Sequence, residues 1–270
     1  MGRQDSKAAD IIVNIGNFPI QLEISDQGFA DMVRERYAAF IDAPPAMPRG
    51  RLEVEVSDPA SPATDEDVSV SCSNGCWSIQ RGDFRAEWRP AERCGRVRQS
   101  RNVYGFDSVL RIIHSLELAR EGAFLLHSAS VIRNGGAFLF SGLSGAGKTT
   151  MARLAPADCV LLSDEISYVR RGAGSYMAWG TPFSGELARP GENVQAPIRG
   201  LYLLKHSDVN RVEPVSRSEA LGRLLRNVLF FANDAGLVGS VFETVSDFVR
   251  RVPVYRLLFR PDPSVWELVK

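Results

Sequence analysis

The fold of this chain is decided by residues 136–150, which read GAFLFSGLSGAGKTT. Residues 142–150 fit G-x-x-x-x-G-K-[ST], the pattern of a loop that wraps nucleotide phosphates. The apolar residues 136–141 predict a buried strand, and residues 149–154 predict a helix that ends before Pro156. Because the pattern requires strand, loop and helix in that order, the sequence predicts an α/β nucleotide-binding domain.

Each residue type in this loop suits phosphate binding. Glycines permit the tight turns that let backbone N–H groups converge on an anion. Lys148 is expected to bridge the β- and γ-phosphates, and the Thr149 hydroxyl to coordinate Mg²⁺. The alternative is a glycine-rich turn with an incidental lysine. The predicted nucleotide-binding residues are Gly142, Leu143, Ser144, Gly145, Ala146, Gly147, Lys148, Thr149 and Thr150.

An acidic pair follows a second apolar run, residues 159–162. If that run is a strand, Asp164 and Glu165 lie at its carboxyl end, where open parallel sheets bind ligands. One carboxylate could then hold Mg²⁺ with Thr149, while the other orients or deprotonates an acceptor hydroxyl. A helix cap or a solvated turn is the alternative role. His127 belongs to an expected strand at residues 123–132, where it is either a core residue or a neighbour of the acids.

Three motifs together resemble the kinase domain of the HPr kinase/phosphorylase family, in which a histidine precedes the phosphate loop and an acidic pair follows it. They are Leu126-His127-Ser-Ala-Ser, the loop at residues 142–150, and Leu162-Ser-Asp-Glu165. The resemblance spans roughly residues 122–270. It implies a P-loop kinase domain with a mixed β-sheet flanked by helices, which transfers the terminal phosphoryl group of Mg-ATP to a hydroxyl. It also implies that His127, Asp164 and Glu165 are catalytic, with Thr149 and the two acids as metal ligands.

The chain departs from that family in two places. The second acid is Glu165, where the family usually has aspartate. The characteristic HPr-binding segment is also missing after the acids, so the acceptor is expected to differ from HPr. The chain looks more like HPr-kinase-related proteins, some of which phosphorylate a peptide hydroxyl. Where the family has its HPr-binding segment, this chain has a polar segment rich in glycine and proline, residues 180–197, which predicts a substrate-facing loop. Arg189 in this loop is either a catalytic candidate or an ordinary solvated arginine.

The first part of the chain has a different pattern. Short strand candidates and one amphipathic segment, residues 26–41, predict a smaller α+β module. A helix with an apolar face is expected to join it to the kinase half. The predicted domains are therefore residues 1–105 for the N-terminal α+β module, 106–121 for the connecting helix, and 122–270 for the nucleotide-binding domain.

Composition excludes several classes of partner. The 270 residues are 44% hydrophobic and carry 32 basic and 32 acidic side chains, so no broad basic surface for nucleic acid is expected. No apolar stretch approaches a membrane span, no signal peptide is evident, and the four cysteines show no zinc-site spacing. These features predict a cytoplasmic protein whose cofactors are ATP and Mg²⁺. The expected partners are nucleotide and a hydroxyl-bearing peptide, protein or small molecule, with a serine-type acceptor favoured, and no membrane or nucleic acid.

Two other functions remain open at the level of sequence. One is a nucleotide-binding regulatory or assembly protein that performs no transfer. The other is a simple NTPase, in which water replaces the acceptor. The family resemblance further suggests a homo-oligomer.

Overall fold

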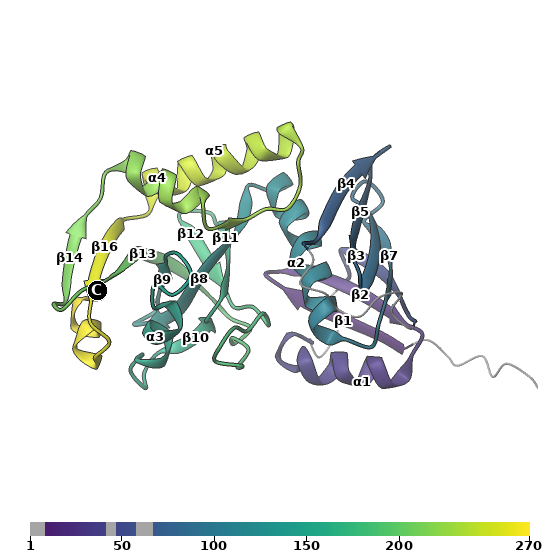
Figure 1. Ribbon diagram of the computed structural model, residues 1–270, viewed down its shortest axis with the longest axis horizontal. Coiled ribbons are helices and arrows are strands. Elements are labelled where there is room, and N and C mark those ends of the chain that lie inside the picture. Colours follow the sequence, from purple (N-terminus) through teal and green to yellow (C-terminus); the bar gives the residue numbers. More distant parts are fainter. Residues whose placement is uncertain (1–8, 42–46, 58–66) are drawn as a thin grey trace, which may run out of the picture. The chain divides into compact units, whose positions relative to one another are not determined.

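The computed structural model of the protein describes residues 9–41, 47–57 and 67–270. Two compact units form, one from Met1–Glu117 with Phe231–Asn233 and the other from Leu118–Phe230 with Asp234–Lys270. Each contains a β-sheet with helices, so the fold is mixed α/β (Figure 1). The functional division at residues 105 and 121 stays a prediction.

The first unit is built on a seven-stranded sheet with the order β1-β2-β3-β7-β6-β5-β4. Its first hairpin turns at Gly16 and Asn17, which both have a φ of 61°, as turns between two twisted antiparallel strands favour. β3 is parallel to β2 and β7, and the other pairs are antiparallel. The strands are β1 (Ala9–Ile15), β2 (Phe18–Ile24), β3 (Gly50–Val56), β4 (Ser69–Ser73), β5 (Cys76–Arg81), β6 (Phe84–Arg89) and β7 (Cys94–Gln99).

Two helices supply the apolar core of this unit. α1 (Gln27–Arg36) begins at Asp26, whose carboxylate accepts a hydrogen bond from the Phe29 N–H at 2.7 Å. Phe29 is fully buried and meets Phe106 of α2 (Val103–Arg120) edge to face, with ring centroids 5.9 Å apart. A short 3₁₀ turn, η1 (Ala38–Phe40), follows α1. α2 covers most of the residues expected for the connecting helix and begins three residues earlier, at Val103.

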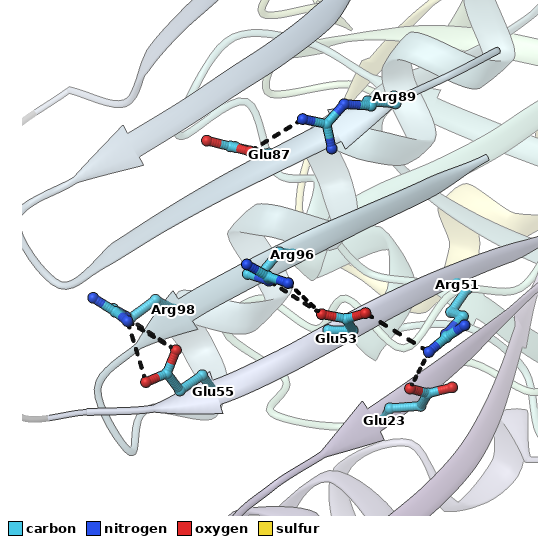
Figure 2. Close-up of polar contacts among 8 residues, drawn as sticks. All are labelled: Glu23, Arg51, Glu53, Glu55, Glu87, Arg89, Arg96 and Arg98. Carbon is cyan, nitrogen blue, oxygen red and sulfur yellow. Dashed lines mark hydrogen bonds and ion pairs between the residues drawn. The ribbon is translucent and has the colours of Figure 1, made fainter. Parts of the chain in front are cut away.

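One face of this sheet carries alternating arginines and glutamates (Figure 2). Arg51 pairs with Glu23 at 2.6 Å and, more loosely, with Glu53 at 3.7 Å. Two pairs join opposite residues of β7 and β3, Arg96 with Glu53 and Arg98 with Glu55. A further pair, Arg89 with Glu87, lies within β6. Because most of these side chains are exposed to solvent, which screens their charges, each pair contributes little to stability. As a result of these ion pairs, each arginine drawn on this face of the sheet lies beside a carboxylate.

The second unit contains nine strands, five of which close into a ring. Around the ring, each strand pairs with the next in the order β8, β9, β13, β12, β11 and back to β8. Only β13 makes parallel pairs, with β9 and β16, so the sheet is mixed. The strands are β8 (Ala123–Arg133), β9 (Gly136–Ser141), β10 (Val160–Ser163), β11 (Ile166–Arg171), β12 (Tyr176–Trp179), β13 (Gln195–His206), β14 (Arg211–Pro214), β15 (Val228–Leu229) and β16 (Val254–Phe259).

Aromatic side chains join the helices of this unit to the sheet. Phe140 of β9 stacks on Tyr202, with centroids 5.6 Å apart, and meets Trp266 edge to face at 5.3 Å. Met151 belongs to the same buried cluster, while Phe248 packs on the sheet through Phe124. The helical elements are α3 (Lys148–Arg153), α4 (Arg217–Leu225), α5 (Ala235–Arg251) and the 3₁₀ segment η2 (Pro263–Leu268).

α4 is a short helix with a side-chain cap. At its start, Ser216 Oγ accepts from the Glu219 N–H at 3.2 Å. It ends at Leu225, because the chain then extends into β15 and pairs with β8. In the described part of the chain, none of the helices has the length and apolar character needed to cross a membrane.

Candidate functional site

The motifs found in the sequence surround one cavity of about 320 Å³ in the second unit. Three separate parts of the chain reach it: β8, the loop between β9 and α3, and the turn between β10 and β11. A fourth contribution comes from the long loop before β13. The lining residues are His127, Ser144, Gly145, Gly147, Lys148, Thr149, Thr150, Asp164, Glu165, Gly185 and Glu186.

The loop between β9 and α3, residues 142–147, has a shape that requires glycine. Gly145 and Gly147 have φ values of 74° and 99°, which side chains of L-residues rarely tolerate. A Cβ on Gly147 would also lie 2.4 Å from the ring of Phe259, and one on Gly142 would lie 2.7 Å from the Cβ of Ala146. The glycines therefore serve both backbone conformation and close packing, and we call these six residues the glycine loop.

Lys148 is held against the glycine loop. Its side chain is almost fully buried, and Nζ donates to the carbonyl oxygens of Gly142 and Leu143 at 3.1 Å each. Burial lowers the pKa of Lys148, while the negative charges of Glu165 and Glu186 act in the opposite direction. The ammonium thus faces a cavity where an anion would find a fixed and poorly solvated cation.

A histidine from β13 contacts the glycine loop. His206 Nε2 lies 2.9 Å from the carbonyl oxygen of Gly145. The imidazole stacks on Phe259, with ring centroids 5.4 Å apart and an interplanar angle of 28°. The same phenylalanine ring closes the space beside Gly147. Phe259 and His206 therefore position the glycine loop from the side of β13 and β16.

The acidic pair, Asp164 and Glu165, forms the turn between β10 and β11, and both of these strands pair with β8. β10 pairs with residues 130–132 of β8 and β11 with residues 123–127, both antiparallel. Asp164 and Glu165 directly follow the last residue of β10, as the sequence predicted. The analogy with open parallel sheets is wrong, because β10 is antiparallel to β8 and turns directly into β11 along the same partner. Ile166 lies opposite His127, and the Ser128 N–H donates to the Glu165 carbonyl at 2.9 Å. This register brings the histidine and the acids to one cavity.

Asp164 ties the cavity to the loop before β13. Its side chain is 2% exposed, and its carboxylate accepts from the N–H groups of Gly185 and Leu187 at 2.9 Å each. Buried carboxylates are stable when backbone donors satisfy their oxygens in this way. Asp164 therefore both lines the cavity and fixes residues 185–187.

His127 has a firmly held backbone and a half-buried side chain. Its N–H donates to the carbonyl of Asn227 at 2.7 Å, and its own carbonyl accepts from the Ser141 hydroxyl at 3.0 Å. The imidazole reaches the cavity that Lys148 and the acids line. The structure thus brings His127, Asp164, Glu165 and the glycine loop together, as their motifs predicted.

The loop at residues 180–194 has two sides. Gly185 and Glu186 line the 320 Å³ cavity, whereas Arg189 lies in a separate groove of about 720 Å³. The Arg189 side chain is 67% exposed and lies 3.7 Å from the Glu192 carboxylate. The sequence predicted a substrate-facing loop at residues 180–197 with Arg189 as its candidate, whereas the residues of this loop that line the 320 Å³ cavity are Gly185 and Glu186. Only the hydrogen bonds to Asp164 show which part of the loop faces the cavity.

The residues suit a magnesium ion that is held partly by phosphates and water. Among the described residues, no group of three or more histidine, cysteine, aspartate or glutamate side chains is arranged to hold a metal ion. Mg²⁺ commonly takes one or two carboxylates and completes its shell with water and substrate phosphate. The Thr149 hydroxyl and a carboxylate of Asp164 or Glu165, which line one cavity, fit such a site.

Two comparisons with known proteins match the part of the chain that contains this cavity. The model of the family described as SynChlorMet cassette protein ScmC matches residues 97–270. The structure of the Hpr(Ser) kinase/phosphatase from Coxiella burnetii matches with a TM-score of 0.24 and 12% identity, over 47% of this chain and 88% of that chain. That structural likeness is distant. No curated protein matches the sequence.

Proposed function

The chain belongs to the SynChlorMet cassette protein ScmC family, and we propose that it is a kinase that transfers the terminal phosphoryl group of Mg-ATP to a hydroxyl. The single observation that supports this is the cavity shared by Lys148, Thr149, His127, Asp164 and Glu165. Phosphoryl transfer depends on positioning and on neutralising charge more than on covalent chemistry by the protein. A fixed cation, metal-binding oxygens and groups able to accept a proton are the parts that the reaction needs.

The glycine loop and Lys148 would bind the phosphates of the nucleotide. Backbone N–H groups of the loop form a concave anion site, and Lys148 adds a charge whose position two carbonyls already fix. Mg²⁺, held by Thr149 and a carboxylate, would neutralise charge on the β- and γ-phosphates. This division assigns nucleotide binding to residues 142–150.

The carboxylates and the histidine would act on the acceptor. Asp164 is immobilised by two backbone donors, which suits a fixed metal ligand or an orienting group. Glu165 and His127 are half-buried at the same cavity and are the groups able to take the hydroxyl proton. The acceptor oxygen would form the new bond to the γ-phosphorus while the bond to the bridging oxygen breaks. ADP then leaves, and the proton ends on Glu165 or His127.

The acceptor is proposed to be a serine-type hydroxyl of a peptide, a protein or a small molecule. The loop at residues 180–194 stands where such an acceptor would approach, because Gly185 and Glu186 border the cavity. Arg189 lies in the adjoining groove, so we propose that any contact it makes with the acceptor occurs away from the reacting phosphoryl group.

The test is transfer of labelled γ-phosphate from Mg-ATP to peptides and proteins encoded near this gene and to free serine. Lys148→Ala should weaken nucleotide binding and thereby abolish detectable transfer, and Asp164→Asn should also abolish transfer. Asp208→Asn is a matched control, since this exposed acid lies outside the cavity.

The three candidate functions give different results in this assay. Labelled acceptor that disappears in both variants and persists in the control supports the kinase. Phosphate release that needs no acceptor favours the NTPase. ATP binding with neither transfer nor release favours a regulatory protein, and either of the last two results would contradict the proposal.

A further inference from the structure

A second cavity, of about 530 Å³, lies on the other side of the glycine loop. Residues 141–146 form one wall, the end of β13 forms another, and α4 with the following turn forms a third. Ser144 and Gly145 line both this cavity and the 320 Å³ cavity. A molecule bound here would therefore contact the same loop as the phosphates.

The second cavity is strongly cationic. Four basic side chains line it against a single carboxylate, that of Glu219; the basic residues are Lys205, Arg223, Arg226 and Arg256. Glu219 is already engaged, because its Oε1 lies 2.6 Å from Arg256 and 3.7 Å from Arg223. Arg256 also pairs with Glu213 at 3.2 Å. These pairs account for two of the four cations.

Lys205 and Arg226 carry the remaining charge. Both side chains belong to exposed residues, and neither forms an ion pair with a carboxylate in residues 9–41, 47–57 or 67–270. The charged face of the first unit is different, since each arginine drawn in Figure 2 pairs with a glutamate. The eight residues drawn there carry equal numbers of positive and negative charges, whereas the second cavity has an excess of positive charge that an anionic ligand can satisfy.

The cationic wall is also joined to the proposed reaction site. Arg226 is the C-cap residue of α4, and the next residue, Asn227, accepts through its carbonyl from the N–H of His127 at 2.7 Å. The Asn227 side chain donates to the carbonyl of Arg223 at 3.0 Å, which fixes the end of the helix. One short turn therefore positions both the arginines of the second cavity and the strand that carries His127.

We propose that the second cavity binds an acidic segment of a peptide acceptor, next to the hydroxyl that receives the phosphoryl group. This inference rests on the proposed kinase function and adds the acceptor's chemistry. The phosphates of the nucleotide already have the glycine loop and Lys148, so Lys205 and Arg226 are left for carboxylates from the acceptor. Charge-assisted contacts would hold the segment, and the shared loop at Ser144 would keep it beside the phosphates.

The test measures binding without nucleotide, so it does not depend on transfer. A fluorescent synthetic peptide with one serine between runs of glutamate is titrated with the full chain at low ionic strength. A second peptide has glutamine in place of every glutamate. The variants are Lys205→Gln with Arg226→Gln, the conservative Arg226→Lys, and Arg217→Gln as a control on the same helix outside the cavity.

We expect the acidic peptide to bind wild type and Arg217→Gln equally, and the double variant about tenfold more weakly. Arg226→Lys should retain most of the affinity, and added salt should weaken binding. Equal or absent binding of the two peptides would overturn the proposal. So would a double variant that loses affinity for ATP while keeping its affinity for the acidic peptide, because the anion would then be the nucleotide's own phosphate.

The result can be separated from that of the kinase assay. If the acidic peptide binds as expected but no acceptor is phosphorylated, the proposed function fails and the anionic site stands. If transfer occurs and depends on Lys148 but the double variant binds the acidic peptide as wild type does, the kinase stands and the second cavity is excluded as the site for an acidic segment.

Discussion

Replacing Asp164 with asparagine should loosen the loop at residues 185–187. The Asp164 carboxylate accepts two backbone hydrogen bonds, from Gly185 and Leu187, each at 2.9 Å. The carboxamide of asparagine has one oxygen, so one of the two N–H groups would face another donor. The perturbation therefore removes one hydrogen bond to a charged acceptor and leaves the other weakened by the loss of charge.

The size of the effect follows from these two contacts. A hydrogen bond to a charged group contributes about 1.5–3 kcal/mol, and every 1.4 kcal/mol is a factor of ten in an equilibrium. Opening of the loop should thus become about ten- to a hundredfold more frequent. Hydrogen–deuterium exchange of a proteolytic peptide covering residues 183–190 would report the change, with a peptide from β13 as an internal reference for global unfolding.

Glu165→Gln is the matched control. It removes the neighbouring charge and leaves both acceptors of Asp164 in place. Exchange in residues 183–190 should rise in Asp164→Asn alone. Unchanged exchange in that variant, or an equal rise in both variants, would refute the argument that the Asp164 carboxylate holds this loop.

Three further predictions concern the loop and the core. Lys148→Ala should weaken ATP binding by about ten- to a hundredfold in calorimetry, because it removes a charged contact to phosphate; unchanged affinity would exclude this phosphate site. Gly147→Ala should lower the free energy of unfolding, measured by urea titration, by about 1–3 kcal/mol more than the control Gly135→Ala. Both glycines have positive φ, but only at Gly147 would the added Cβ meet the Phe259 ring. Equal losses in the two variants would contradict this. Burial lowers the pKa of His114 to about 3, so as the pH falls this histidine is protonated in the unfolded chain before it is protonated in the folded chain. The free energy of unfolding should therefore fall as the pH drops from about 6.5 towards 3, by about 2 kcal/mol at pH 5. His114→Leu should remove that part of the pH dependence, and identical pH profiles would show that the histidine does not cause it.

Local patterns were sufficient to predict the elements that position the site. Strand β9 is apolar at all but its last position and is followed by glycines, two of which have positive φ, so a buried strand that leads into a tight loop could be predicted. Ser216 could likewise be identified as a helix cap, because a capping serine and a glutamate three residues later form a local signal.

Features that depend on distant pairing could not be predicted in the same way. The closed ring of strands arises because β13 pairs with β12 in its first part and with β9 and β16 in its second. α5 was missed because Gly236, Gly239 and several β-branched residues lower its helix propensity, although Leu237, Val241, Val245 and Phe248 repeat at helical spacing. Burial of that apolar face outweighs the weak local preference.

The fold constrains the side chains of Asp164 and Glu165 differently, which is relevant to the presence of glutamate at position 165, where the HPr kinase/phosphorylase family usually has aspartate. Asp164 must keep its short side chain, because its oxygens reach the N–H groups of Gly185 and Leu187 from a fixed turn. Glu165 is fixed through its backbone, where its carbonyl accepts from Ser128, while the charge of its side chain acts on Lys148. An extra methylene at Glu165 therefore changes the reach of a group within the cavity without disturbing the loop. A longer acid at position 164 would lose the two hydrogen bonds that hold residues 185–187, whereas these two bonds do not depend on the length of the acid at position 165.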